Sequence, residues 1–401
     1  MDKFFKISER GSSVSDEIIG GLTTFLAMAY IIAVNPSMME AAGIPFNAAL
    51  TATCLGAAIM TIAMGLIANR PIALASGMGI NAIVAFTLCL GEVAVDWRVA
   101  MAVVFLEGII ILILVLCGLR KAIMDAIPVG LRRAIGIGIG LFIAFILQVL
   151  NVKGGLVISI IVATIVGIPL GVTPLPTEWN FGLDFSAFAA PFQTDPASGN
   201  MAIIQVFVQP VLLMFVFSLL MSDFFDTMGT VVAVGEQGKF VDKKGDVEDV
   251  QPILMVDSAA AAVGGFLGAS SITSFVESTS GAAAGARTGL SNIVIGVLFI
   301  VCAFFAPIVG MVSGAATCGA LVVVGYLMMT DVGEIDWKSI ESAFPAFITI
   351  VGIPMTYSIT NGIGMGFISY CIIKVAQGKA GEVKPLMWVA ALAFLLMFVL
   401  G

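Results

Sequence analysis

Apolar residues are grouped along this chain in long runs, and short polar stretches separate the runs. The runs are roughly 15–22 residues long, and a helix needs about 20 residues to cross the hydrocarbon layer of a membrane. Alternating strands of an outer-membrane barrel would be shorter, at about ten residues each. The pattern therefore predicts an all-α polytopic membrane protein. We expect about fourteen apolar segments, near residues 17–38, 47–68, 71–90, 98–118, 131–151, 154–172, 202–222, 253–268, 269–285, 290–312, 315–329, 343–358, 361–376 and 386–400.

Composition supports a membrane protein, and the positions of the charged residues predict how it is oriented in the membrane. Hydrophobic residues make up 60% of the chain and charged residues 11%, which excludes an ordinary water-soluble fold. Lys and Arg cluster in the N-terminal tail and at 120–133, 239–244 and 374–384, so these parts are expected to face the cytoplasm. The polar stretch 173–200 contains no Lys or Arg and is expected outside. We therefore predict a bacterial inner-membrane protein with a cytoplasmic N-terminus and no removable signal peptide.

The charge pattern conflicts with the number of spans in one place. An odd number of spans must separate Arg133, expected inside, from Thr173, expected outside, yet the sequence shows two apolar runs between them. Either one run is re-entrant, or the two form one irregular unit, or a span is missing from 131–172.

The residue types present limit the chemistry. Histidine is absent, and the six Cys lie in apolar stretches without a CxxC pair, which is typical of small packing residues. No metal site, cofactor or activated nucleophile is visible, so an intramembrane enzyme is disfavoured. Any proton transfer must use carboxylates.

Gly and Pro interrupt two apolar runs, at Arg70–Ala82 and at Gly264–Gly285, and the two breaks fall at corresponding places in the two halves of the chain. Such paired, broken segments indicate a transporter site at the interface between repeats. Small-residue packing between helices is the alternative explanation.

Acidic residues inside the predicted spans are functional candidates because a charge near the bilayer centre is costly. Asp223 and Asp226 are spaced i, i+3 and share a helix face. Two carboxylates this close do not both ionise easily, so one is expected to hold a proton. Alternatively, Asp226 lies near a helix end as a solvated local cap. Glu107 and Asp257 are interpreted as structural groups that pair with polar neighbours.

The second break carries an acid and the first carries an amide. A half-helix that begins near Glu277 would present free N–H groups beside its carboxylate, which suits a polar heterocycle with donors and acceptors. In the first break, Asn81 can donate and accept, and Gly77 and Gly79 permit close approach to the backbone.

At these residues the sequence resembles the nucleobase–ascorbate transporter family (nucleobase:cation symporter family 2), in its guanine/hypoxanthine permease branch. The matching motifs occur in order along nearly the whole chain: Gly20–Ile31 with Asn35 and Pro36, Gly77–Ala82, Asp223–Thr230, Glu277 and Ser278 with Gly285–Leu290, and Pro354–Ile359 with Asn361 and Gly362.

The resemblance implies a seven-plus-seven inverted repeat in which short antiparallel strands meet within the two broken segments. It implies a core domain in two parts, 1–125 and 201–312, and a gate domain in two parts, 126–200 and 313–401. The first gate part is shorter than the family pattern, with the shortfall near Phe145 to Lys153, where the parity conflict also lies.

The resemblance also implies the function, which is proton-coupled uptake of purine nucleobases (hypoxanthine, guanine or adenine) by a secondary active transporter. The expected partners are the base, a proton or other cation, and the lipid bilayer, with no nucleic acid, and a homodimer is left open. The implied base-binding residues are Asp223, Glu277, Asn81 and Gly79, with Phe275 and Phe224 or Phe225 for stacking. The implied proton-coupling residues are Asp223, Asp226 and Glu277.

Other functions are weighed against this one. A transporter of the same architecture with xanthine, uracil or an anion as cargo is the first alternative, although the two carboxylates Asp223 and Glu277 favour a neutral base with N–H donors. A channel is a further alternative, although broken segments with acidic groups suit occlusion better than a continuous pore.

Overall fold

The fold is described from a computed structural model of the chain, which describes residues 2–91, 93–118, 182–241, 247–305, 332–333, 335–356 and 359–400. The region of the parity conflict, 131–172, lies outside the described residues, as does most of the predicted first gate part. The elements of the first half are α1 (Asp2–Phe5), α2 (Val14–Met28), α3 (Ile31–Ala41), α4 (Phe46–Ile67), β1 (Leu74–Ser76), α5 (Met78–Ala82), the π-helix η1 (Ile83–Cys89) and α6 (Trp97–Leu116).

The second half repeats much of this order. After the 3₁₀ turn η3 (Ala190–Phe192) come α10 (Ala202–Val208), α11 (Pro210–Gly238), α12 (Val250–Leu267), β2 (Ile272–Ser274), α13 (Ser278–Ala283) and α14 (Leu290–Ala303). The C-terminal elements are α17 (Ile340–Thr356), α18 (Ile359–Ala376), the 3₁₀ turn η5 (Ala380–Glu382) and α19 (Pro385–Leu400).

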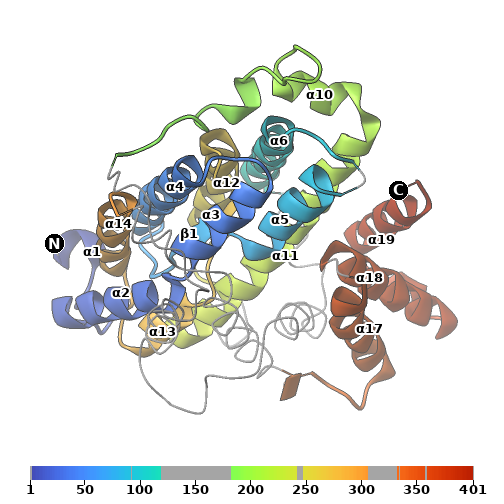
Figure 1. Ribbon diagram of the computed structural model, residues 1–401. Coiled ribbons are helices and arrows are strands. Elements are labelled where there is room, and N and C mark those ends of the chain that lie inside the picture. The colour runs from blue at the N-terminus through green and yellow to red at the C-terminus, as the bar shows by residue number, and fades with distance from the viewer. Residues whose placement is uncertain are drawn as a thin grey trace, which may run out of the picture.

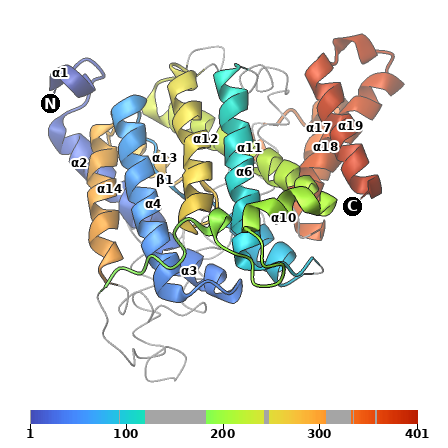
Figure 2. The same ribbon diagram turned by 90° about the horizontal axis from the view of Figure 1, so that it is seen from above.

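Helices from the two halves alternate across the main layer. In Figure 2, α14, α4, α12 and α6 stand side by side, and each contacts the next. The second-half helices α14 and α12 therefore flank and separate the first-half helices α4 and α6. The helices α2 and α11 lie against this layer through α14 and α6, and α17–α19 form a group at one side that α18 joins to α11 (Figure 1). The division into core and gate domains stays a prediction.

The two Gly-rich breaks meet as a short antiparallel sheet. Strands β1 and β2 pair with Leu74 opposite Ser274 and Ser76 opposite Ile272, which confirms the expected strands. A Cβ on Gly77 would lie 2.8 Å from the Thr273 Cγ2 atom, so glycine allows the strands to approach.

The backbone around these strands is satisfied from within the protein, as lipid requires. The Thr61 hydroxyl accepts from the Leu74 N–H and donates to its carbonyl, at 2.9 Å in both cases. The Ala73 N–H donates to Ser278 Oγ at 3.0 Å, and the Phe275 N–H donates to the Ala73 carbonyl at 2.9 Å. Irregular backbone is therefore stable here because side chains and the opposite break supply its partners.

Two predicted segments differ from the structure. The segment expected at 17–38 is two helices that are interrupted between Met28 and Ile31. The segment expected at 202–222 breaks at Gln209, because Pro210 cannot donate a hydrogen bond to the helix that precedes it. The second helix then continues past the polar residues to Gly238. Polar side chains in the middle of this helix do not end it, and Ser222, Asp223, Thr227 and Thr230 are buried in the protein interior.

Within the described residues, five helices are long and apolar enough to cross a membrane: Val14–Ala41, with its interruption, Phe46–Ile67, Trp97–Leu116, Pro210–Gly238 and Val250–Leu267. Four shorter apolar helices accompany them: Met78–Cys89, Leu290–Ala303, Ile340–Thr356 and Asn361–Ala376. The chain is thus a multi-pass membrane protein, as the apolar runs predict.

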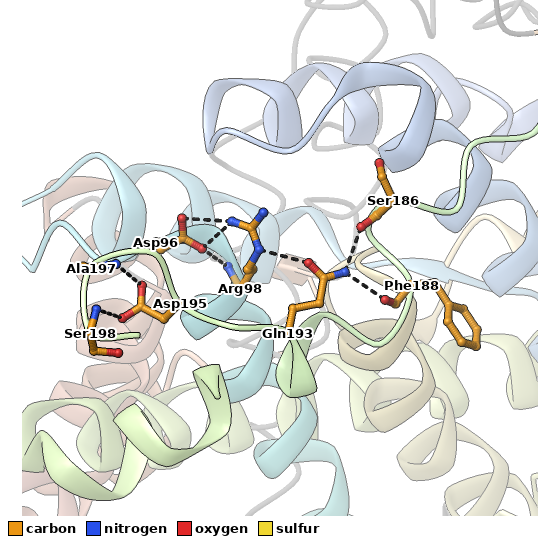
Figure 3. Close-up of polar contacts among 8 residues, drawn as sticks. All are labelled: Asp96, Arg98, Ser186, Phe188, Gln193, Asp195, Ala197 and Ser198. Carbon is orange, nitrogen blue, oxygen red and sulfur yellow. Dashed lines mark hydrogen bonds and ion pairs between the residues drawn. The ribbon is translucent and has the colours of Figure 1, made fainter. Parts of the chain in front are cut away.

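A polar loop is fastened to the start of α6 (Figure 3). The Arg98 side chain donates to Gln193 Oε1 at 2.9 Å and pairs with Asp96 at 3.1 Å. Gln193 Nε2 in turn donates to the carbonyls of Ser186 and Phe188. The same loop holds Asp195, whose pKa is lowered: burial opposes ionisation, but hydrogen bonds from Ser198 and the Ala197 N–H outweigh it.

The crossing of α6 and α12 gives a first prediction. A Cβ on Gly108 would overlap the backbone nitrogen of Ala262, and a Cβ on Gly265 would lie 2.5 Å from the Phe105 nitrogen. We expect Gly108→Val to lower the free energy of unfolding by about 2 kcal/mol or more, because backbone atoms cannot move aside. Thermal unfolding in detergent measures this. Gly229→Ala is the control, since nothing lies within 4 Å of its added Cβ; equal midpoints for both variants would contradict the prediction.

Candidate substrate and proton site

A buried acid and a buried phenol meet at the paired breaks. Glu277 directly precedes α13 and is 8% exposed, and Tyr30 lies at the interruption between α2 and α3 and is 2% exposed. The Tyr30 hydroxyl donates to Glu277 Oε1 at 2.6 Å. The half-helix expected at Glu277 is thus present, and its acid is held by one strong hydrogen bond while a second carboxylate oxygen remains for other contacts.

Asp226 belongs to the same cluster of charges. It lies within electrostatic reach of Glu277 and Asp257. Roughly three helical turns separate it from the end of α11 at Gly238, so it is not a cap at a helix end, which was the alternative interpretation. Asp223, one turn earlier on α11, is fully buried. The structure therefore places both aspartates in the interior part of this helix, next to β2 and α13.

Asp257 anchors the second break. Its Oδ1 accepts from the Ser274 N–H at 2.9 Å and from Ser274 Oγ at 2.8 Å, and its Oδ2 accepts from Thr227 Oγ1 at 2.7 Å. Thr227 also lies 3.0 Å from Thr273 Oγ1. One carboxylate on α12 thereby joins α11 to β2. The prediction that Asp257 pairs with polar neighbours is confirmed.

The other predicted structural acid, Glu107, also has a polar neighbour. It is fully buried on α6, and Ser271 Oγ lies 3.5 Å from its Oε2 atom. This contact links α6 to the residues just before β2.

The first break contributes an amide with unused hydrogen-bonding capacity. Asn81 on α5 is fully buried, and neither its Nδ2 nor its Oδ1 has a hydrogen-bond partner among the residues that the structure describes. A buried amide without partners is costly, and such groups call for an explanation such as a ligand or water. Gly79, two residues earlier, is partly exposed. Helix α5 contacts α11, which carries Asp223 and Asp226, and α3, which follows Tyr30.

The two aromatic candidates lie in different surroundings. Phe275 is 6% exposed and belongs to an apolar cluster with Tyr30 and Ala73, directly at the break. Phe224 is 2% exposed and packs with Ile363 and Phe367 of α18. Phe275 is thus grouped with Tyr30, which donates to Glu277, whereas Phe224 lies in the apolar cluster shared by α11 and α18. The side chain of Phe225 lies outside what the structure describes.

These groups offer hydrogen-bond acceptors, a donor–acceptor amide and exchangeable protons in the buried interior of the protein. Carboxylates such as Glu277 accept from N–H groups, and Asn81 both donates and accepts. Asp226 lies within electrostatic reach of both Asp257 and Glu277, so a charge that enters or leaves this part of the interior acts on it directly. The arrangement can bind a neutral heterocycle with N–H donors and can exchange a proton.

Sequence reasoning missed the role of Tyr30. Its hydroxyl lies within a predicted span, where a buried phenol needs a hydrogen-bond partner, and that requirement was the available signal. The partner, Glu277, is 247 positions away in the chain, and nothing in the sequence identifies it.

Comparisons with known proteins agree with this architecture. A model of the permease family matches residues 15–149 and 143–365 of the chain. The two matches meet at 143–149, where the sequence analysis places the shortfall. The guanine/hypoxanthine permease PbuG of Bacillus subtilis is 39% identical, with 100% of this chain and 99% of that protein covered. The adenine permease AdeP of Escherichia coli is 35% identical, over 100% and 96%.

Solved structures share the fold at low identity. The transmembrane domain of the cyanobacterial bicarbonate transporter BicA has a TM-score of 0.63 at 15% identity, covering 87% of this chain and 97% of that one. SLC26A9 has a TM-score of 0.60 at 12% identity, covering 91% and 66%. At these identities the likeness shows the fold alone. The chain has the seven-plus-seven inverted-repeat fold of these transporters.

Proposed function

The chain belongs to the permease family, and from this membership we propose that it is a secondary active transporter that carries purine nucleobases together with a proton. It is a transporter and not an enzyme. The cargo of the proposal comes from the relatives' names, guanine/hypoxanthine permease and adenine permease. The residues that we propose to bind this cargo are the buried polar groups at the two breaks.

The observation that carries the proposal is the buried carboxylate of Glu277 at the start of a half-helix, after the strand β2. This strand pairs with β1 of the first break, which leads to Asn81, a buried amide with no hydrogen-bond partner among the described residues. A purine base is flat, neutral and edged with N–H donors and nitrogen or oxygen acceptors. Glu277 accepts from its N–H groups, and Asn81 pairs with an adjacent donor and acceptor. Phe275, grouped with Tyr30, offers a flat apolar surface for the purine ring. Gly79 has no side chain, so the base can approach the backbone closely there.

Other cargoes fit less well. An anion would need cationic or neutral groups at the half-helix ends, and the proposed site instead holds Asp226 within electrostatic reach of both Asp257 and Glu277. Desolvated carboxylates repel an anion strongly. Xanthine and uracil carry N–H donors too, so competition among bases is the measurement that ranks them.

We propose that the buried carboxylates also couple transport to a proton. Asp226 lies within electrostatic reach of Glu277, and Asp223 is buried one helical turn before Asp226, which supports the proposal. A proton that neutralises one of two nearby acids stabilises the charge of the other. Protonation and base binding would then favour the same arrangement of the core, and displacement of core against gate would carry both across. We place the protein in the bacterial inner membrane with its N-terminus in the cytoplasm.

Uptake by cells that lack their own purine permeases tests this function. Cells expressing the chain are expected to accumulate radiolabelled hypoxanthine, to lose that accumulation with a protonophore, and to show competition by unlabelled guanine or adenine. Accumulation that survives the protonophore would contradict proton coupling. Absence of both uptake and equilibrium binding of all three purines, in protein shown to be inserted, would overturn the purine assignment.

A further inference from the structure

A polar cavity whose lining includes neither Glu277 nor Tyr30 lies on the face that we predict to be cytoplasmic. Its volume is about 430 Å³, within the range of about 300–1,000 Å³ that is typical of small-molecule sites. Five cationic side chains line it, from four separate parts of the chain: Lys6, Arg10, Arg70, Lys239 and Arg287.

The acidic residues of the cavity do not neutralise this charge. Among the residues that the structure describes, three acids and five cations line it, so two positive charges remain in excess. Glu248 and Asp249 both pair with Arg70, at 3.2 and 2.9 Å, and Glu9 pairs with Lys6 at 3.5 Å. The acids are thus already engaged by two of the five cations.

The remaining cations keep unused donors. Arg10 and Arg287 donate to backbone carbonyls through Nη1 only, as far as the described residues show, and a guanidinium has five N–H donors. Burial and the nearby charge of Arg70 lower the pKa of Arg10. Arg70 is 4% exposed, and its Nε has no partner among the described residues. These cations repel one another, and an anion between them would relieve that repulsion.

The backbone around the cavity is held in an uncommon conformation. Lys6, Lys239 and Asp249 line the cavity with φ values of 57°, 60° and 52°, and Asn69, next to Arg70, has a φ of 50°. Residues other than glycine rarely adopt this left-handed region, and such positions cluster at ligand sites. Three such residues line this cavity and a fourth adjoins it, so the backbone here is held in its shape by the surrounding structure.

Arg70, which lines the cavity, also belongs to the first break. The Asn292 amide donates to the carbonyls of Arg70 and Ile72, at 3.0 and 2.8 Å, just before β1. Asn69 accepts from the Gly289 N–H at 2.9 Å. A ligand that contacts Arg70 therefore touches the segment that leads into the strand pair.

We propose that this cavity binds a small anion that carries a phosphate group. A phosphomonoester has a charge of about −1.5 to −2 at neutral pH, which matches the excess charge of the cavity. Its oxygens suit forked guanidinium donors, and three arginines are present. The transported base is neutral and binds elsewhere, so this site is distinct from the cargo site and does not depend on the proposed cargo. The phosphate group belongs either to a soluble monoester or to the headgroup of an anionic lipid.

Binding to the purified full chain tests the proposal and separates the two sources. Inorganic phosphate and a nucleoside monophosphate are titrated in detergent, with the corresponding nucleoside as the phosphate-free control, and thermal unfolding is followed. In parallel, the protein is placed in vesicles of neutral lipid with and without phosphatidic acid. A rise in midpoint with a soluble phosphate identifies a soluble ligand, and a rise only with phosphatidic acid identifies a lipid headgroup.

Matched variants locate the site. Lys239→Gln and Arg10→Gln are each expected to weaken binding of the effective phosphate compound about tenfold, since one charge-assisted hydrogen bond is lost. Lys338→Gln removes the same charge from an exposed position outside the cavity and is expected to bind as the parent does. No midpoint shift with any phosphate-bearing compound, or equal weakening by Lys338→Gln, would overturn the proposal.

Discussion

Glu277→Gln is expected to reduce the initial rate of purine uptake by roughly 10- to 100-fold. Glutamine keeps the shape of the side chain but removes the charge and replaces one acceptor oxygen by a donor. A hydrogen bond to a charged group contributes about 1.5–3 kcal/mol, and about 1.4 kcal/mol corresponds to a factor of ten. The substitution also weakens the hydrogen bond from the Tyr30 hydroxyl, which donates to Glu277 at 2.6 Å, because a neutral amide oxygen replaces a carboxylate as its acceptor. Uptake of radiolabelled hypoxanthine below saturation measures the effect.

Two variants serve as comparisons for Glu277→Gln. Tyr30→Phe removes only the hydroxyl and leaves the acid free to accept from the base, so its loss of uptake should be smaller. Glu40→Gln alters an exposed acid and should transport at the parent rate when the amount of inserted protein is equal. A rate for Glu277→Gln within about twofold of the parent would remove this acid from the proposed site.

Asp257→Ala is expected to have the largest effect on stability, lowering the free energy of unfolding by roughly 2–5 kcal/mol. The carboxylate accepts three hydrogen bonds, from the Ser274 N–H, Ser274 Oγ and Thr227 Oγ1. Each buried donor that loses its partner costs about 1–3 kcal/mol, partly recovered where a hydroxyl rotates to another acceptor. Because this side chain joins β2 to α11 and α12, the strand pair should loosen when it is removed. Thermal unfolding in detergent reports the change.

The comparison for Asp257→Ala is Asp336→Ala, in which the same carboxylate is removed from an exposed position where it accepts from the Lys338 N–H. That change should shift the midpoint by less than a quarter as much. Ser274→Ala removes one of the three contacts and should fall between the two. Equal midpoints for Asp257→Ala and Asp336→Ala would show that α12 does not anchor the break.

The two breaks were predictable from sequence because their signal is local. Gly and Pro interrupt otherwise apolar runs at Arg70–Ala82 and Gly264–Gly285, and lipid permits irregular backbone only where the protein satisfies it. The half-helix after Glu277 was predicted from this local signal. The strands β1 and β2 were predicted from the family resemblance, and the structure confirms them.

The partners of the site residues were not predictable in the same way. Tyr30 and Glu277, or Thr227 and Asp257, meet only when the two halves interlock, and no spacing in the sequence encodes a contact across 247 or 30 positions. The interruption after Met28 has no Gly or Pro at it, so the apolar pattern alone favours one continuous helix there.

The alternation of α14, α4, α12 and α6 has a consequence for how the protein is made. When the first half has left the ribosome, α4 and α6 have inserted but the helix that separates them, α12, has not been synthesised. Until α12 is inserted, the surfaces of α4 and α6 that contact it in the folded protein, including Gly108, are exposed to lipid or covered by a chaperone. Assembly therefore depends on contacts between residues far apart in the chain, which form slowly. Co-expression of the two halves as separate polypeptides should accordingly yield stable protein only when both are present.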